Sequence, residues 1–189
     1  ANTGLPDGMG MPPEAAKPMR ELYATLPVIP ATEVLQRFAD KDGPPGHLFW
    51  MKYCAESPDF NVGDVMMVSG AEMPLDVRAA YEAPFPSSEY EAGARAFPSL
   101  VPIFPDDVEI PANRQAWQTL AAFAKPFRTS FADGDPVTAG GDRVLQQRVI
   151  GAKGMDHIVI KGAGHFLQET HGPEVATAMI DFMRRFVPR

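Results

Sequence analysis

A carboxylate and an imidazole occupy matching places in the second half of the chain, each just beyond a predicted β-strand. The first strand, predicted over Pro126–Ala132, leads into an Asp-Gly-Asp-Pro turn that contains Asp135. The second, predicted over His157–Lys161, leads into a Gly-Ala-Gly turn followed by His165. In open α/β sheets reacting groups gather beyond the carboxyl ends of strands, and an aspartate that orients an imidazole prepares it to act as a general base. Asp135 and His165 are therefore the predicted catalytic acid and base.

The alternatives to this pair are ordinary turn-forming and packing roles. An aspartate in such a turn commonly accepts hydrogen bonds from its own backbone, and Asp133 lies closer to the strand end than Asp135 does. His157 begins the second strand and is expected to face solvent or to pack. His47 and His171 are expected to be exposed, in loops or at helix ends. The order of acid then base at matching strand ends favours the catalytic interpretation.

Composition and charge argue against several other classes of function. The net charge of −7 disfavours nucleic-acid binding, which requires clustered lysine and arginine. No run reaches the roughly 20 apolar residues that cross a bilayer, so no membrane span is expected. The single cysteine, Cys54, fits a reducing, cytoplasmic compartment and is expected to be a buried apolar side chain rather than a nucleophile. No ligand spacing indicates a metal site and no glycine-rich loop indicates phosphate binding, so we expect neither metal nor cofactor.

Helices and strands alternate from about Asp107 onward, which is typical of a parallel α/β sheet. The predicted helices of this part are Asn113–Phe123, Asp142–Val149 and Pro173–Phe186. Two strands are too few, because a parallel sheet buries both faces and normally has several more. We therefore expect an incomplete sheet, with its N-terminal strands missing from these residues.

Residues 1 to about 107 hold most of the 20 prolines and most of the methionines. Because proline interrupts helices, this region is predicted to consist of short helices joined by turns. The predicted elements are the helices Glu14–Leu26, Ala31–Ala39, His47–Ala55 and Asp76–Tyr81, and an exposed loop over Asp40–Gly46.

Several stretches together resemble the haloalkane dehalogenases, a family with the α/β-hydrolase fold. They are Lys125–Pro136 and Gly162–Glu169 at the two strand ends, and Ala1–Pro6, Tyr81–Pro86 with Tyr90–Pro98, and Ala112–Trp117 elsewhere. Ala1–Pro6 resembles the exit from the sixth strand of the family's sheet. Tyr81–Pro86 with Tyr90–Pro98 resembles its cap motif, and Ala112–Trp117 resembles the helix that returns from the cap. The resemblance covers nearly the whole chain except about residues 13–47.

The resemblance implies a fold and a division of the chain. It implies that residues 1–7 and 108–189 form the C-terminal part of an α/β-hydrolase core, and that residues 8–107 form a mostly helical cap. The cap motif also occurs in related epoxide hydrolases, so it indicates the fold more strongly than the substrate.

The resemblance also implies a mechanism. An aspartate attacks the carbon that bears the halogen and forms an ester, and a histidine oriented by a second acid activates the water that hydrolyses this ester. His165 matches the base and Asp135 the orienting acid. Trp50, in a cap helix, matches one of the two N–H donors that hold the leaving halide, because indole donates but does not accept.

Core packing is the competing explanation for the aromatic residues. Trp50 lies beside Phe49 and Tyr53 in a predicted helix, and Trp117 is expected to be structural. Phe49, Phe85 and Phe97 could line an apolar pocket suited to haloalkanes, and packing explains each of them equally well.

The nucleophile of such an enzyme is not in this chain, since the 189 residues contain neither a G-x-S-x-G elbow nor the family's Asp-Trp-Gly turn. We therefore expect the chain alone to be inactive and to need an N-terminal half of the core, with a small apolar haloalkane, water and a halide ion as its other partners. An epoxide hydrolase opens the epoxide ring of its substrate with two cap tyrosines. This function is an alternative, because Tyr53, Tyr81 and Tyr90 are present. A non-catalytic fragment or binding module is a further alternative.

Overall fold

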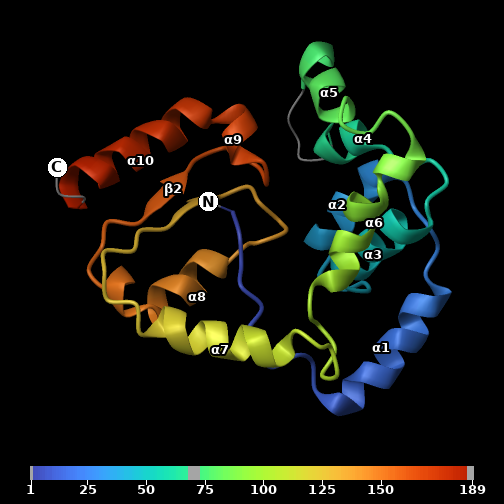
Figure 1. The fold of residues 1–189 in the computed structure, drawn as a ribbon, viewed down its shortest axis with the longest axis horizontal. Coiled ribbons are helices and arrows are strands. Elements are labelled where there is room, and N and C mark those ends of the chain that lie inside the picture. The colour runs from blue at the N-terminus through green and yellow to red at the C-terminus, as the bar shows by residue number, and fades with distance from the viewer. Residues whose placement is uncertain (1, 68–72, 187–189) are drawn as a thin grey trace. The chain divides into compact units, whose positions relative to one another are not determined.

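The computed structural model describes residues 2–67 and 73–186 (Figure 1). Ala1, with which the stretch Ala1–Pro6 begins, lies outside the described residues. The chain divides into two compact units, one formed by residues 1–7 with 112–189 and the other by residues 8–111. We call them the α/β unit and the helical unit and describe each by itself.

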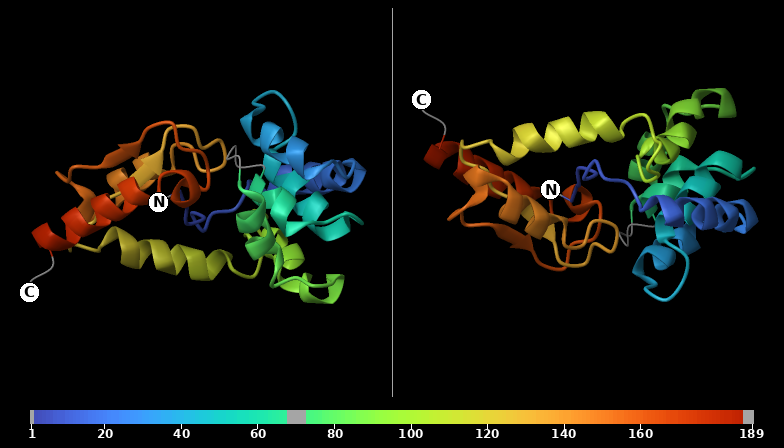
Figure 2. Two further views of the ribbon diagram at one scale, coloured as in Figure 1. Left: turned by 90° about the horizontal axis from the view of Figure 1, so that it is seen from above. Right: turned by 90° about the horizontal axis from the view of Figure 1, so that it is seen from below.

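The helical unit consists of short helices (Figure 2), and most of them directly follow a proline. Its α-helices are α1 (Pro13–Thr25), α2 (Ala31–Ala39), α3 (Gly46–Glu56), α4 (Val62–Met67), α5 (Leu75–Glu82) and α6 (Ala92–Ala96). Prolines directly precede α1, α2, α3 and α5. The fixed φ angle of proline suits the entry to a helix, and its missing N–H leaves no bond unmade there. The predicted short helices joined by turns are confirmed.

Helix α3 forms the centre of this unit. Leu48, Phe49, Tyr53 and Cys54 are all at most 4% exposed, and residues of α1 and α2 pack around them. Helix α2 approaches α3 closely at Gly46, where an added β-carbon would lie 2.5 Å from the backbone nitrogen of Phe38. The predicted exposed loop therefore ends one residue earlier than expected, because Gly46 is buried and begins α3.

The α/β unit contains a two-stranded parallel sheet among its described residues. Its α-helices and strands in chain order are α7 (Ile110–Ala121, whose first two residues belong to the helical unit), β1 (Ser130–Ala132), α8 (Gly141–Arg148), β2 (Ile158–Ile160), α9 (Leu167–Thr170) and α10 (Gly172–Phe186). Ser130 pairs with Ile158 and Ala132 with Ile160. The predicted alternation of helices with parallel strands is confirmed, and the chain is richer in helix than in strand.

Both strands are shorter than the sequence predicts. Regular pairing begins only at Ser130, because the N–H of Thr129 donates to the imidazole Nδ1 of His157 rather than to a strand carbonyl (3.2 Å). His157 therefore precedes β2 and packs against the entry to β1. Pro126, which lacks an N–H, lies farther still from the paired residues.

Helices cover the sheet on its two faces (Figure 1). On one face, Phe131 of β1 packs with Trp117 of α7 and with Leu145 and Val149 at α8. On the other, Ile160 of β2 packs with Leu167 of α9, and Val175 of α10 joins this cluster. The two strands are thereby held between helices, with their carboxyl ends toward the candidate site. Among the described residues, no helix combines the length and the apolar character that crossing a membrane requires.

Candidate active site

Asp135 and His165 meet beyond the carboxyl ends of β1 and β2. The imidazole Nδ1 of His165 lies 3.0 Å from the carboxylate Oδ1 of Asp135. The side chain of Asp135 is 1% exposed, whereas that of His165 is 23% exposed. A buried carboxylate thus holds one nitrogen of an imidazole that remains partly open to its surroundings, which is the arrangement a general base requires.

The carboxylate of Asp135 is itself fixed by the turn that follows it. Its Oδ1 also accepts from the backbone N–H of Val137 at 2.8 Å. Its Oδ2 accepts from the backbone N–H of Thr138 at 3.3 Å and from the hydroxyl of the same residue. Burial raises the pKa of Asp135, but hydrogen bonds from His165, Thr138 and Val137 outweigh it, and the pKa is lowered overall. The group is therefore an anion at neutral pH.

The anionic carboxylate determines the tautomer of His165. A carboxylate only accepts hydrogen bonds, so Nδ1 must carry the proton shared with Asp135. The second nitrogen, Nε2, then has its lone pair free in the neutral ring and can take a proton. The ring of Phe166 lies beside it, with centroids 4.9 Å apart.

The two loops are joined by one bond between their backbones and by one bond from backbone to side chain. Gly134 donates its N–H to the carbonyl of Ala163 at 3.1 Å, and Gly162 donates its N–H to the carboxylate of Asp133 at 2.8 Å. An added β-carbon at Gly134 would lie 2.8 Å from that carbonyl, so only glycine allows this approach. These contacts extend the pairing of β1 and β2 into the loops.

Asp133, the competing candidate for the acid, has a different set of partners. Its carboxylate accepts from Gly162, lies 3.4 Å from the ammonium group of Lys161, and is exposed. The hydrogen bond from the Gly162 N–H lowers the pKa of Asp133. Asp133 therefore fastens the loop of His165, while Asp135 contacts the imidazole.

The other histidines lie apart from this pair. His157 lies 3.0 Å by Nε2 from the Ala152 carbonyl oxygen, and His171 lies 2.8 Å by Nδ1 from the hydroxyl of Thr170. The prediction of an exposed His47 is wrong: this residue is half-buried in α3, and its Nε2 is buried without a hydrogen-bond partner among the described residues. Burial lowers the pKa of His47, although a hydrogen bond with the Pro98 backbone opposes the shift.

Trp50 belongs to the helical unit and is described within it. It lies in α3, half-buried, and its ring stacks on that of Tyr53 at a centroid distance of 6.2 Å. Phe49 beside it is buried, Phe85 is half-buried, and Phe97 is 71% exposed. Packing in the core of α3 therefore accounts for Phe49 and partly for Trp50.

The structure gives the three tyrosines distinct surroundings. The hydroxyl of Tyr53 accepts from the backbone N–H of Asn61 at 3.3 Å, and burial raises the pKa of Tyr53. Tyr81 is half-buried in α5, and Tyr90 is 61% exposed.

Trp117 and Cys54 are structural, as the sequence predicts. The indole N–H of Trp117 donates to the carbonyls of Leu5 and Pro6, at 3.1 and 3.0 Å. Cys54 is fully buried, and burial raises its pKa to about 12. Such a thiol stays protonated at neutral pH and does not serve as a nucleophile.

Asn2 is a site residue that the sequence reasoning missed. Its side-chain amide contacts the end of β1 and the loop of His165. It lies outside every predicted element, and only its place in the Ala1–Pro6 stretch pointed toward the site.

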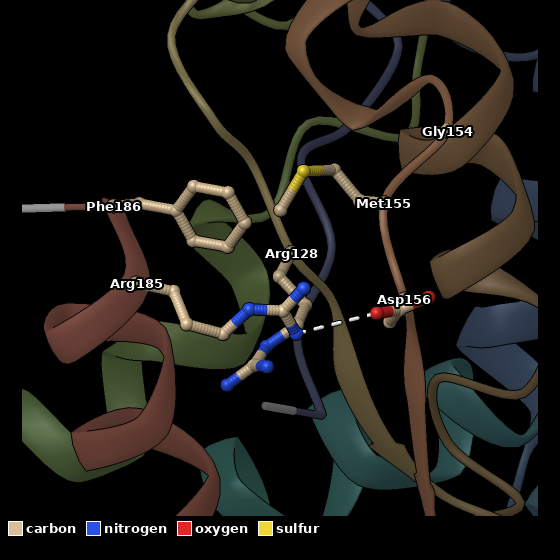
Figure 3. A pocket seen from close by; sticks show the side chains of 6 residues that line it. All are labelled: Arg128, Gly154, Met155, Asp156, Arg185 and Phe186. Atoms are coloured by element: carbon tan, nitrogen blue, oxygen red, sulfur yellow. Dashed lines mark hydrogen bonds and ion pairs between the residues drawn. The ribbon is translucent and has the colours of Figure 1, made fainter.

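A separate cavity of about 220 Å³ lies at the opposite ends of the strands (Figure 3). The residues that line it are Arg128, Gly154, Met155, Asp156, Arg185 and Phe186. Its charged groups are already paired, Arg128 with Asp181 at 3.1 Å and Arg185 with Asp156 at 3.3 Å. Among the described residues, no group of three or more histidine, cysteine or carboxylate side chains is arranged to hold a metal ion.

Sequence comparison relates the chain to haloalkane dehalogenases. It is 46% identical over 146 residues to the haloalkane dehalogenase of Psychrobacter cryohalolentis, which covers 76% of this chain and 48% of that protein. It is 43% identical over 134 residues to the haloalkane dehalogenase of Mycobacterium marinum, covering 70% and 45% of the two chains. It is 42% identical over 136 residues to haloalkane dehalogenase 1 of Mycobacterium bovis, covering 71% and 45%. No family model matches the chain.

These relatives and the parallel strands identify the class as the α/β-hydrolases. Within that class, the resemblance to the haloalkane dehalogenase family is confirmed: this chain corresponds to a segment of that family's proteins. The chain spans about half the length of the curated relatives it matches.

Proposed function

We propose that this chain supplies the acid and the base of a hydrolase that converts haloalkanes to alcohol and halide. The observation that carries the proposal is the 3.0 Å contact between His165 Nδ1 and the buried carboxylate of Asp135. In a chain related to haloalkane dehalogenases, this pair matches the base and the orienting acid of an ester-hydrolysing enzyme.

The proposed reaction has two steps. First, an aspartate outside these 189 residues attacks the carbon that bears the halogen, forming a C–O bond as the carbon–halogen bond breaks and halide leaves. Then His165 Nε2 takes a proton from water, whose oxygen attacks the ester carbonyl. The alkoxide departs with that proton as alcohol, and the carboxyl group left behind releases the other proton of the water to solvent, which regenerates the carboxylate. Asp135 keeps Nδ1 protonated and stabilises the imidazolium that forms in between.

We assign the helical unit to the cap and the α/β unit to the C-terminal part of the core. In the cap, the indole N–H of Trp50 is proposed to hold the leaving halide, because it donates without competing as an acceptor. The half-burial of Trp50 is compatible with this role, since it leaves part of the ring uncovered. A small apolar haloalkane, water and halide are the ligands that this assignment implies, and we place the reaction in the cytoplasm because the only thiol is unpaired.

The rest of the core is the proposed macromolecular partner. Parallel sheets normally have more than two strands and are covered on both faces. Here Val159 of β2 is 47% exposed, and Met179, Ile180 and Met183 of α10 are 48–60% exposed. Exposed apolar side chains beside a short sheet suit a segment that supplies further strands, the nucleophile among them.

The epoxide hydrolase alternative requires tyrosine hydroxyls that donate to the opening ring. Tyr53 is buried in the core of the helical unit, which does not favour this role. A non-catalytic module would retain the Asp135–His165 contact without any turnover.

The test joins this chain to the remaining part of the Psychrobacter relative and measures bromide release from 1-bromobutane. The fusion is expected to release bromide over many turnovers, and the 189-residue chain alone is expected to release none. His171→Gln, which alters a histidine bonded only within its own turn, serves as the matched control and should retain activity. A folded fusion that hydrolyses an epoxide instead, or neither substrate, would overturn the proposed function.

A further inference from the structure

Asn2 makes three hydrogen bonds that join the two loops of the candidate site. Its side-chain oxygen Oδ1 accepts from the backbone N–H of Ala132, at the end of β1, at 2.8 Å. Its side-chain nitrogen Nδ2 donates to the carbonyl oxygens of Gly164 and His165, both at 2.8 Å. One side chain therefore connects the strand that leads to Asp135 with the loop that presents His165.

A primary amide suits these partners. It offers two N–H donors and one carbonyl acceptor, and here both donors face carbonyls while the acceptor faces an N–H. The opposite orientation of the Asn2 amide would place like groups against each other, so the three contacts fix the orientation. An aspartate would keep the bond to Ala132 but would set an acceptor against two carbonyls, and an alanine would lose all three bonds.

Asn2 bonds to the part of the His165 loop that the other hydrogen bonds between the two loops do not reach. Gly134 and Asp133 hold the second loop at Ala163 and Gly162. The peptide groups that directly flank the reacting imidazole, at residues 164 and 165, are held by Asn2 instead. Hydrogen bonds weaken steeply with misalignment, so a small shift of this loop would separate Nδ1 from the carboxylate.

We propose that Asn2 is a positioning residue, which keeps the imidazole of His165 in register with the carboxylate of Asp135. Its catalytic importance rests on the proposed function, whereas its geometric effect does not. It acts through the backbone of both loops and touches neither substrate nor reacting atoms.

The tautomer of His165 tests the proposal without any turnover. Nitrogen-15 NMR of the neutral imidazole, recorded near pH 9, is expected to find His165 protonated at Nδ1 in the unaltered chain, with the resonance assigned from His165→Gln. In Asn2→Ala and in the similarly shaped Asn2→Leu, the Nε2-protonated form is expected to become the major one, because the carboxylate no longer holds Nδ1. Folded variants that keep the Nδ1-protonated form would overturn the proposal.

Trp117→Phe provides the matched control. It removes the bonds from the indole to Leu5 and Pro6, and so loosens the same N-terminal stretch without touching either loop. The tautomer of His165 is expected to stay unchanged in this variant. An equal change in Trp117→Phe and Asn2→Ala would mean that general loosening is responsible, and would reject the positioning role.

Asn2→Asp keeps the bond to Ala132 and removes the two bonds to the loop of His165, so it tests the two sets of bonds separately. It also keeps the proposal testable if the alanine variant does not fold. The Ala132 amide should stay as protected from hydrogen exchange as in the unaltered chain, since Oδ1 is retained. Amides of residues 163–166 should exchange roughly tenfold faster, because losing a hydrogen bond normally speeds opening by about that factor. Unchanged exchange in residues 163–166 would contradict the proposal. Failure of bromide release in the fusion, by contrast, leaves these measurements intact and bears on the reaction alone.

Discussion

At the scale of single residues, Asp135 combines two roles that appear as alternatives in the sequence. It caps the turn that follows it, through Val137 and Thr138, and it accepts from the imidazole of His165. The capping bonds fix the carboxylate, so the turn-forming role prepares the proposed catalytic one. Spacing alone nominates both Asp133 and Asp135, and the structure separates them, because Asp135 contacts the imidazole of His165 whereas Asp133 accepts from the Gly162 N–H.

The lowered pKa of Asp135 predicts how stability depends on pH. Because the folded-state pKa lies below the ordinary value of about 3.9, the stabilisation is complete above that value and is lost as pH falls through the folded-state pKa. Asp135→Asn should lower the free energy of unfolding by about 1.5–3 kcal/mol at pH 7. Urea unfolding at several pH values should find this difference shrinking in acid.

The control for this prediction is Asp156→Asn, which removes an exposed ion pair with Arg185. It should change the free energy of unfolding by at most about 1 kcal/mol. A difference between Asp135→Asn and the unaltered chain that stays constant from pH 7 to pH 2 would contradict the linkage.

Cys54 gives a second prediction at this scale. The thiol is fully buried and its pKa is raised to about 12, so at pH 8 it is both protonated and inaccessible. A thiol reagent such as dithiobis-nitrobenzoate should label the native chain only as fast as it opens, and should label it at once in 6 M guanidinium chloride. Rapid labelling of the native chain would contradict the buried position.

At the scale of elements, the sequence predicts the helices that show a clear apolar repeat or that begin directly after a proline. Helix α2 has the predicted bounds, and the other predicted helices differ from the observed ones by one to three residues at their ends. The sequence did not predict the short helices α4, α6 and α9, because a helix of one or two turns is too short to show a clear apolar repeat. The predicted strands are longer than the observed ones. The apolar character of the sequence does not reveal that the N–H of Thr129 donates to the imidazole of His157 instead of to a strand carbonyl.

Two glycines should respond differently to substitution by alanine, because Gly46 lies at the contact between α2 and α3 whereas Gly93 is uncrowded. Gly46→Ala would force a β-carbon to within 2.5 Å of the Phe38 backbone, and should destabilise the chain by about 1–3 kcal/mol. Gly93→Ala, in α6, meets nothing within 4 Å and should be neutral or stabilising by up to about 1 kcal/mol. Thermal unfolding of both variants checks this, and equal effects would contradict the close approach at Gly46.

At the scale of the whole molecule, two units carry different parts of the proposed chemistry. The α/β unit holds Asp135 and His165, and the helical unit holds Trp50. The sequence nominated all three, since strand order and family resemblance mark them. It did not reveal Asn2, because a side chain that bonds only to backbone groups leaves no pattern of residue types in the loops it joins.

The most direct measurement of the central claim is the bromide stoichiometry of His165→Gln in the fusion with the Psychrobacter segment. Without its base, the enzyme should still form the ester but should not hydrolyse it. It is expected to release one bromide per active site and to gain the mass of one alkyl group, while the unaltered fusion turns over continuously. Continuous bromide release by His165→Gln would contradict the role of His165 and with it the account of this site.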